Sequence, residues 1–173
     1  MTDASCLRPA TPADHDALWQ MLGPVFRAGD TYAIDPDISR EAALAYWTGP
    51  ERHVFVLDEG GVLGSYYLQR NQKGGGSHVC NCGFVTHPEA RGRGVARRML
   101  AHALDTARGL GFRAMQFNFV VSTNTRAVQT WQRAGFDIVG RLPQAFHHPQ
   151  DGYVDALVMF RALGADPSEG DDT

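Results

Sequence analysis

A short segment rich in arginine and glycine has the composition of an anion-binding turn. It spans residues 91–96 and reads Arg-Gly-Arg-Gly-Val-Ala, between an apolar run and a segment with helical periodicity. At the start of a helix, unpaired backbone N–H groups and the helix dipole both favour a negatively charged ligand. Gly92 and Gly94 carry no Cβ atom, so the backbone can approach such a ligand closely. We call residues 91–96 the anion cradle and expect them to bind phosphate groups.

Two common nucleotide-binding motifs do not fit the anion cradle. A P-loop would need a Lys-Ser or Lys-Thr pair after its last glycine, where this chain has Val95 and Ala96. A dinucleotide-binding fold would need its glycine fingerprint near the N-terminus, with an acidic residue about 20 positions later. The sequence therefore excludes both classes of nucleotide-binding protein.

A helix is expected directly after the anion cradle. Apolar residues recur at three- and four-residue spacing over residues 95–110, whereas Arg97 and Arg98 fall on the opposite face. With Arg91 and Arg93 they surround one spot of a chain whose formal net charge is −3. The local field therefore attracts anions although the whole chain is weakly acidic.

Periodicity and turn residues predict the other elements. Strands are expected at residues 5–9, 52–58, 61–70, 78–86, 114–121, 136–142 and 153–161. Helices are expected at residues 12–28, 40–47, 95–110 and 124–134. The last helix is expected to be capped by Ser122 or Thr123 and ended by Gly135.

Two sequence blocks, in this order and spacing, resemble the GNAT superfamily of acyl-CoA N-acyltransferases. The first is R-x-x-G-x-A, from Arg91 to Ala96, which looks like the pyrophosphate-binding signature of that superfamily. The second runs from Asn124 to Phe136 and is similar to its N-x-x-A-x-x-x-Y-x-x-x-G-F block, with Trp131 in place of the tyrosine. The resemblance covers roughly residues 4 to 163.

The resemblance implies an α/β (α+β) fold, the GNAT fold. A mixed, largely antiparallel sheet of about seven strands would carry about four helices on its two faces. The strands before and after the cradle helix would splay apart to admit the pantetheine arm of acetyl-CoA, the expected co-substrate. The residues implied at this coenzyme are Phe84, Val85, Thr86, Arg91, Gly92, Arg93, Gly94, Val95, Ala96, Asn124 and Trp131. Backbone N–H groups near Val85 would polarise the thioester carbonyl.

Trp131 occupies the place of the acid that the superfamily usually employs. The tyrosine of the second block would protonate the departing thiolate, whereas an indole N–H cannot release a proton near neutral pH. Coenzyme A thiolate has a pKa near that of a free thiol, about 8.5. We therefore expect the thiolate to leave with hydrogen-bond help or with a proton from water.

Asn81 and Asn118 are the expected catalytic residues. If their strands adjoin, period-two counting lets the two side chains converge beside the thioester. With Asn124 and the run Val154-Asp155-Ala156, they resemble the fungal proline-analogue (azetidine-2-carboxylate) N-acetyltransferases. This resemblance implies that Asn81 and Asn118 orient the acceptor, because an uncharged amide cannot act as a base. The alternative is that both are satisfied asparagines of the core.

The loop over residues 29–37 and the helix after it would wall the acceptor site in this superfamily. Tyr32, Asp35, Asp37 and Trp47 are therefore candidates for substrate contact. The alternative is turn formation by the aspartates and core packing by the aromatic residues.

Composition indicates one compact globular domain. Of the 173 residues, 43% are hydrophobic and 20% charged. We expect a single domain over residues 1–163 and a disordered acidic tail over residues 164–173. The sequence has no run of eighteen apolar residues and no signal-peptide pattern. A cytoplasmic protein without a membrane or nucleic-acid partner is the expectation.

The three cysteines are expected to be buried structural thiols. Their number is odd, and Cys80 and Cys82 alternate along a predicted strand. Cys80 and Cys82 are too close together in the sequence for a zinc site, which would also need two further ligands at suitable spacing. No metal is therefore expected.

Together these features predict an N-acetyltransferase that moves an acetyl group from acetyl-CoA to a small amine. A proline-like or other amino acid is the leading acceptor. The alternatives are an acetyltransferase for aminoglycosides, polyamines or protein N-termini, and a non-catalytic acyl-CoA-binding sensor. A homodimer is also compatible with the resemblance, since dimers are common in the superfamily.

Overall fold

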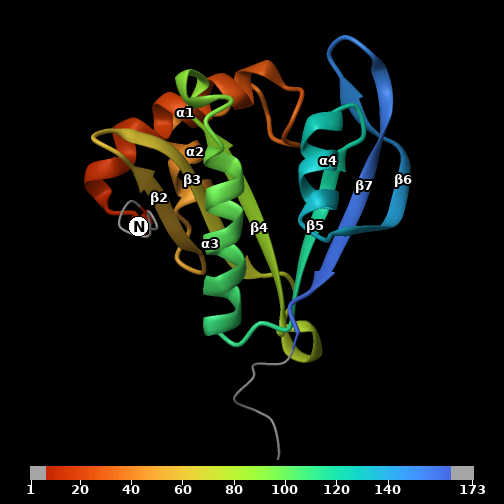
Figure 1. Ribbon diagram of the computed structural model, residues 1–173. Coiled ribbons are helices and arrows are strands. Elements are labelled where there is room, and N and C mark those ends of the chain that lie inside the picture. The colour runs from red at the N-terminus through yellow and green to blue at the C-terminus, as the bar shows by residue number, and fades with distance from the viewer. Residues whose placement is uncertain (1–6, 165–173) are drawn as a thin grey trace, which may run out of the picture.

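The computed structural model describes residues 7–164, which form a seven-stranded sheet covered by helices (Figure 1). The strands lie side by side in the order β1-β2-β3-β4-β5-β7-β6. From β1 to β7 their bounds are Leu7–Pro9, His53–Asp58, Val62–Arg70, Val79–Thr86, Ala114–Val121, Asp137–His148 and Gly152–Ala162. All neighbouring strands are antiparallel except β4 and β5, which are parallel. The predicted mixed, largely antiparallel sheet is confirmed.

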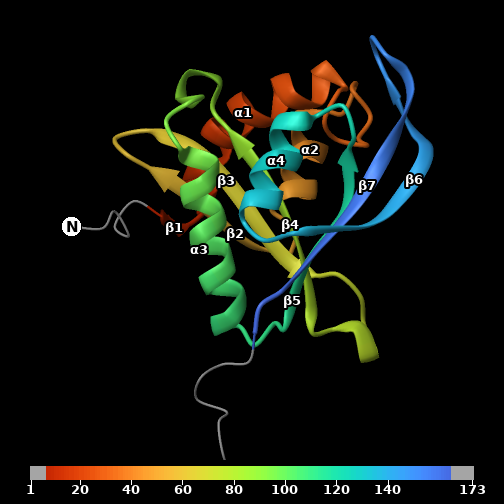
Figure 2. The same ribbon diagram turned by 45° about the vertical axis from the view of Figure 1, so that its right-hand side comes forward.

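Helices cover both faces of the sheet (Figure 2). In the described part of the chain the α-helices are α1 (His15–Ala28), α2 (Arg40–Trp47), α3 (Val95–Gly109) and α4 (Thr125–Arg133). α1 and α2 pack on one face around Leu22 and Phe26, and α3 and α4 pack on the other around Met99 and Phe117. None of the helices within residues 7–164 has the length and apolar character that crossing a membrane requires.

β4 and β5 separate after a short parallel contact. Residues 79–81 pair with residues 114–116, and in the described strands the pairing goes no further. Both views show the two strands diverging from this point (Figures 1 and 2). The predicted splay is therefore present, and it leaves backbone N–H and C=O groups along both strand edges free of sheet partners.

The cap of α4 differs from the expectation. Asn124, rather than Ser122 or Thr123, caps the helix, because its side-chain oxygen accepts the N–H of Ala127 at 3.3 Å. Its own N–H donates to the carbonyl oxygen of Val121 at 3.0 Å. The two preceding residues thus form the turn that leaves β5, and the cap falls one position later.

β6 is longer than the expected strand, which ended at residue 142. Its ladder with β7 shifts register between Leu142 and Phe146, where Gln144 has a φ of 49°. Pro143 lacks a backbone N–H and interrupts the alternation of side chains. Because of this interruption, the sequence pattern does not indicate that the strand resumes and continues to His148.

The expected ends of the chain fall largely beyond the described residues. Of the predicted acidic tail only Gly164 is described, and of the predicted first strand residues 5 and 6 are outside. The domain boundary at residue 163 stays a prediction.

β3 and β4 approach each other closely where Tyr67 lies over Gly83. The two residues are register partners. A Cβ atom added to Gly83 would lie 2.4 Å from Cε1 of Tyr67 and 2.9 Å from its hydroxyl oxygen. Only glycine therefore fits beneath this ring. Because Gly83 has no side chain, the ring of Tyr67 can pack directly on the backbone of β4.

We expect Gly83→Ala to destabilise the protein by about 1–3 kcal/mol, because the ring or the strand must move to admit the methyl group. Equilibrium unfolding in urea measures this change. Gly109→Ala is the matched control, since a Cβ there meets no atom within 4 Å and lies in a helix. Equal stabilities of the two variants would contradict the close contact.

Arg8 links β1 to the first helical turn and to β2. Its guanidinium donates to both carboxylate oxygens of Asp14 at 2.9 and 2.8 Å and to Asp58 at 2.8 Å. Asp14 also accepts the backbone N–H of Thr11 at 2.7 Å. The Arg8 guanidinium is the main reason that the pKa of the buried Asp14 falls to about 2.

The lowered pKa of Asp14 makes the stability of the fold depend on pH in the acidic range. The folded chain holds the carboxyl of Asp14 ionised to a lower pH than the unfolded chain, whose aspartates titrate near about 3.9. The stabilisation is therefore complete above that value and is lost as the pH falls toward 2. We expect the stability difference between wild type and Asp14→Asn to shrink by about 1–2 kcal/mol between about pH 5 and pH 2.

Urea unfolding at a series of pH values measures this difference. Asp16→Asn serves as control, because Asp16 pairs with Arg40 on the surface, where its side chain is 80% exposed. A difference between wild type and Asp14→Asn that stays constant with pH would contradict the role given to Arg8.

Candidate active site

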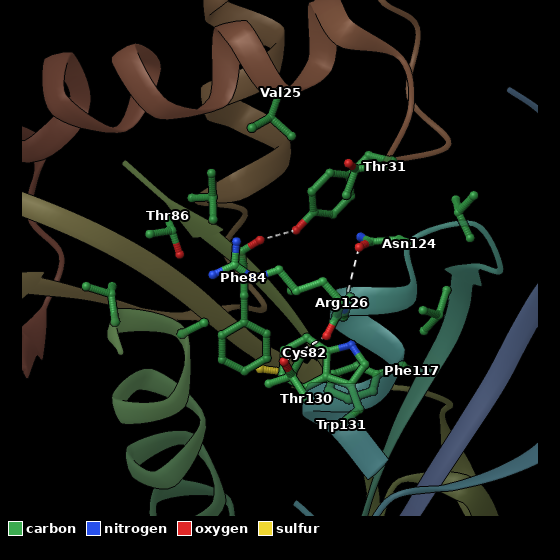
Figure 3. A pocket seen from close by; sticks show the side chains of 18 of the residues that line it. Val25, Thr31, Cys82, Phe84, Thr86, Phe117, Asn124, Arg126, Thr130 and Trp131 are labelled. Carbon is green, nitrogen blue, oxygen red and sulfur yellow. Dashed lines mark hydrogen bonds between the residues drawn. The ribbon is translucent and has the colours of Figure 1, made fainter. Parts of the chain in front are cut away.

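A cavity of about 1050 Å³ follows the gap between β4 and β5 (Figure 3). Its walls come from α1, the α1–α2 loop, α2, β3, β4, the anion cradle, α3, β5 and α4. The walls include all residues that the sequence predicts as catalytic or coenzyme-binding: Asn81, Phe84, Val85, Thr86, Arg91, Gly92, Arg93, Gly94, Val95, Ala96, Asn118, Asn124 and Trp131. The fold thus brings the two sequence blocks and both asparagines to one cavity, while their individual roles stay predictions.

The edge of β4 presents backbone groups to this cavity. In an antiparallel pair, every second residue directs its N–H and C=O groups at the neighbouring strand. The ladder between β3 and β4 is unbroken and ends with a bond from the N–H of His87 to the carbonyl oxygen of Leu63. By this alternation, the backbone N–H and C=O groups of Val85 are directed at β3. Those of Phe84 and Thr86 therefore face the gap.

The anion cradle opens onto the same cavity at the start of α3. Gly92 and Gly94 have φ values of 78° and 73°, which strain any residue with a side chain. Gly94 is the N-cap of α3, so the first-turn N–H groups of this helix point out of the cradle. Arg91, Arg93 and Arg97 line the cavity around them.

Glu59, in the turn between β2 and β3, takes up part of this positive charge. Its carboxylate lies 2.7 Å from Arg98 and 3.5 Å from Arg93. The fourth arginine predicted around the cradle is thus directed at Glu59, while the other three remain on the cavity wall.

Trp131 contributes to an apolar wall beside the gap. Its ring centroid lies 4.7 Å from that of Phe117 and 5.2 Å from that of Phe84. Figure 3 shows these three residues together below Asn124, the cap of α4. Arg126 lies on the same helix and adds a further positive charge to the cavity wall. The tryptophan that replaces the tyrosine of the second block therefore packs against the strands on both sides of the gap.

Asn81 and Asn118 meet at Gln116, where β4 and β5 part. Asn81 donates from Nδ2 to the carbonyl oxygen of Gln116 at 3.0 Å, and Nε2 of Gln116 donates to Oδ1 of Asn118 at 2.9 Å. Nδ2 of Asn118 donates in turn to Oδ1 of Asn71 at 2.6 Å. Asn81 is buried and satisfies a strand carbonyl. Asn118 is exposed, and its amide has capacity left for a ligand.

Three tyrosines from separate elements form another part of the cavity wall. Tyr32 comes from the α1–α2 loop, Tyr46 from α2 and Tyr67 from β3. The hydroxyl of Tyr32 donates to the carbonyl oxygen of Phe84, a bond drawn as a dashed line in Figure 3. Burial raises the pKa of Tyr32 and of Tyr67. Both phenols therefore stay protonated and can donate hydrogen bonds.

The described cysteines behave as structural thiols. Cys80 and Cys82 are both buried and free, and Cys82 contributes to the cavity wall. Burial raises the pKa of Cys80 to about 12 and that of Cys82 well above its ordinary value. Neither forms a thiolate near neutral pH. Among residues 7–164 there is no group of three or more His, Cys, Asp or Glu side chains that could hold a metal.

Of the loop candidates, only Tyr32 lines the cavity. Trp47 is fully buried and donates its Nε1–H to Oγ of Ser65 at 3.0 Å, as a core residue does. Asp35 accepts the N–H of Asp37 at 2.9 Å, which is a turn contact. The core and turn alternatives therefore hold for these three residues.

Sequence reasoning missed several residues of the cavity wall, among them Tyr46, Tyr67, Gln69 and Arg126. Arg126 could have been found, because it follows Asn124 by two positions within the second block. Tyr67 and Gln69 alternate along β3 and so share one face. Nothing in their local sequence shows that this face adjoins the gap, since that depends on the pairing of β3 with β4.

Comparisons with known proteins agree with this geometry. The sequence model of the Acetyltransferase (GNAT) family matches residues 16–136. The N-acetyltransferase aca1 of Schizosaccharomyces pombe is 35% identical over 148 residues, which are 75% of this chain and 71% of that protein.

Two solved structures are similar throughout the fold. A GCN5-related N-acetyltransferase from Kribbella flavida is 43% identical with a TM-score of 0.85, over 90% of this chain and 96% of that one. A GNAT superfamily phosphinothricin acetyltransferase from Sinorhizobium meliloti, solved in complex with acetyl-CoA, is 25% identical with a TM-score of 0.79 over 95% and 93% of the two chains. Since the family match spans more than half of the chain and the fold agrees over nine tenths of it, this protein is a member of the acetyltransferase (GNAT) family.

Proposed function

We propose that this enzyme moves the acetyl group of acetyl-CoA to the amine of a small amino or imino acid, by direct attack in a ternary complex. The observation that carries the proposal is the continuity of the cavity from the anion cradle, along the gap, to Asn81 and Asn118. A donor with a phosphate-bearing end and a reactive end would occupy such a cavity together with a second, small substrate. We propose the cytoplasm as the location, because both substrates are metabolites of that compartment.

The cavity walls suit each part of acetyl-CoA. The anion cradle and its arginines would hold the pyrophosphate through backbone N–H groups and charge. The free strand edge at Thr86 would bond an amide of the pantetheine arm, and Trp131 would cover its apolar part. Acetyl-CoA, when bound, supplies an acetyl group already activated as a thioester.

The transfer forms a C–N bond and breaks a C–S bond. The N–H group of Phe84 would stabilise the negative charge that develops on the thioester oxygen, a contribution usually worth about 3 kcal/mol. The amine loses one proton and the departing thiolate gains one. Trp131 cannot supply that proton near neutral pH, so we assign it to water.

The charge of the cavity favours a small acceptor that carries a carboxylate. Among the described residues its wall includes Arg91, Arg93, Arg97 and Arg126 and no aspartate or glutamate. Aminoglycosides and polyamines carry several positive charges, and the described wall offers them no carboxylate partner. An amino acid brings a carboxylate, which meets no acidic side chain among the described wall residues and which the free N–H of the Asn118 amide can bond.

We expect acetyl-CoA-dependent thiol release with L-proline analogues or ordinary amino acids, and little with polyamines or aminoglycosides. Asn118→Ala should lower kcat/KM by roughly 10- to 100-fold, because one hydrogen bond to a charged group is lost. Steady-state assays over this acceptor panel measure both effects. Gln20→Ala, an exposed position on α1, is the matched control and should keep wild-type rates.

Two results would overturn this assignment. Turnover confined to polyamines, aminoglycosides or a peptide N-terminus would replace the proposed acceptor. Binding of acetyl-CoA without turnover on any acceptor would place the protein among the acyl-CoA-binding sensors.

We expect the pH dependence of kcat/KM to follow the amine of the acceptor. The described residues of the cavity wall include no Asp, Glu, His or Lys, and their titratable groups are tyrosines, arginines and Cys82. Burial raises the pKa of Tyr32, Tyr67 and Cys82, so none of these accepts a proton near neutrality. The reactive amine must therefore arrive neutral or lose its proton to water.

Profiles of kcat/KM between about pH 6 and pH 10, recorded with proline and with a fluorinated proline of lower amine pKa, test this expectation. The inflection should move with the acceptor. An inflection common to both acceptors near neutrality would instead reveal a basic group of the protein.

A further inference from the structure

Arg52 lies between α2 and β2 and stacks against two tyrosine rings. Its Cζ atom lies 4.2 Å from the ring centroid of Tyr46 and 3.9 Å from that of Tyr67. Its Nε donates to Oε1 of Gln69 at 3.0 Å, and its Nη1 donates to the carbonyl oxygen of Tyr46. The guanidinium is half-buried. Arg52 therefore holds three side chains of the cavity in one arrangement.

These three side chains belong to the acceptor end of the cavity. Tyr46, Tyr67 and Gln69 all line it, whereas Arg52 itself lies behind them. On the sheet, Gln69 is the register partner of Asn81. The group is thus next to the point where β4 and β5 part, rather than at the anion cradle.

The charge of Arg52 has no counter-ion within the described part of the chain. None of the ion pairs found there includes Arg52, and its contacts are with neutral groups. A half-buried charge is screened less by water than a surface charge, so its field extends into the adjacent cavity. That field favours an anionic group on the cavity side of the two tyrosines.

We propose that Arg52, Tyr46, Tyr67 and Gln69 form the subsite that selects the carboxylate of the acceptor. Together with the amide of Asn118, the tyrosine hydroxyls and the Gln69 amide are the donors that contact this group, and Arg52 is a positioning residue that orients the tyrosines and Gln69 and supplies the attractive charge. A cation against the ring also makes a phenol a stronger hydrogen-bond donor. This inference rests on the proposed function, because it assigns the carboxylate of the same amino or imino acid.

The test compares one amino acid with its primary amide, which keeps the amine and the side chain but lacks the charge. Arg52→Gln should raise the KM for the amino acid on the order of tenfold, in line with a desolvated cation–π site, with kcat nearly unchanged. The KM for the amide should change less than about twofold. Arg52→Lys should restore most of the affinity for the amino acid. Arg133→Gln, which removes an exposed charge from α4, is the control and should behave as wild type.

An equal rise of KM for both acceptors, or a fall of kcat with unchanged KM, would overturn the assignment and leave Arg52 as a packing residue. If Arg52→Gln does not fold, Tyr46→Phe replaces it. This variant keeps the ring stack and should still raise KM for the amino acid alone, and an unchanged KM would refute the subsite.

The wild-type enzyme separates this inference from the proposed function. Turnover of the amide with a lower KM than that of the amino acid would leave acetyl transfer intact and refute the carboxylate subsite. Turnover of neither acceptor would refute the proposed function, and the subsite with it.

Discussion

The separation of β4 from β5 after Asn81 is the constraint on which the rest of the site depends. Strands that part leave N–H and C=O groups without partners, and each such group costs about 1–3 kcal/mol if it is buried and unsatisfied. Asn81 satisfies the carbonyl of Gln116 with its side chain, and Tyr32 satisfies that of Phe84 with its hydroxyl. The N–H groups that remain on the edge of β4 are the ones that we propose for the thioester and the pantetheine arm.

Aromatic packing on both faces keeps this gap open. On the α3–α4 face, Trp131 lies against Phe84 of β4 and Phe117 of β5, so one ring braces both strands. On the α1–α2 face, Tyr32 packs edge-on against Phe26, with ring centroids 5.6 Å apart. Buried aromatic rings contribute much of the apolar area of a core. The geometry of the site is therefore maintained by the same contacts that stabilise the fold.

Local sequence patterns predicted most of the fold because each element is dominated by neighbours along the chain. The bounds of β5, Ala114–Val121, agree residue for residue with the run of apolar and alternating side chains. The patterns failed where one residue interrupted them. Pro143 interrupts the alternation in β6, so the second half of the strand was not predicted. The turn before α4 includes the two expected capping residues, so the cap is Asn124.

The sequence by itself predicted the anion cradle and the other residues that we propose for the coenzyme, because glycines, arginines and a helix start that act together are consecutive residues. It also indicated the two asparagines, since alternation along a strand is a local property. Only the tertiary structure decided which tyrosines line the cavity. Tyr32, Tyr46 and Tyr67 come from a loop, a helix and a strand, and the packing of α2 on β3 brings two of them against the Arg52 guanidinium. Contacts between segments that are distant in the sequence depend on the packing of the whole core, which local sequence patterns do not predict.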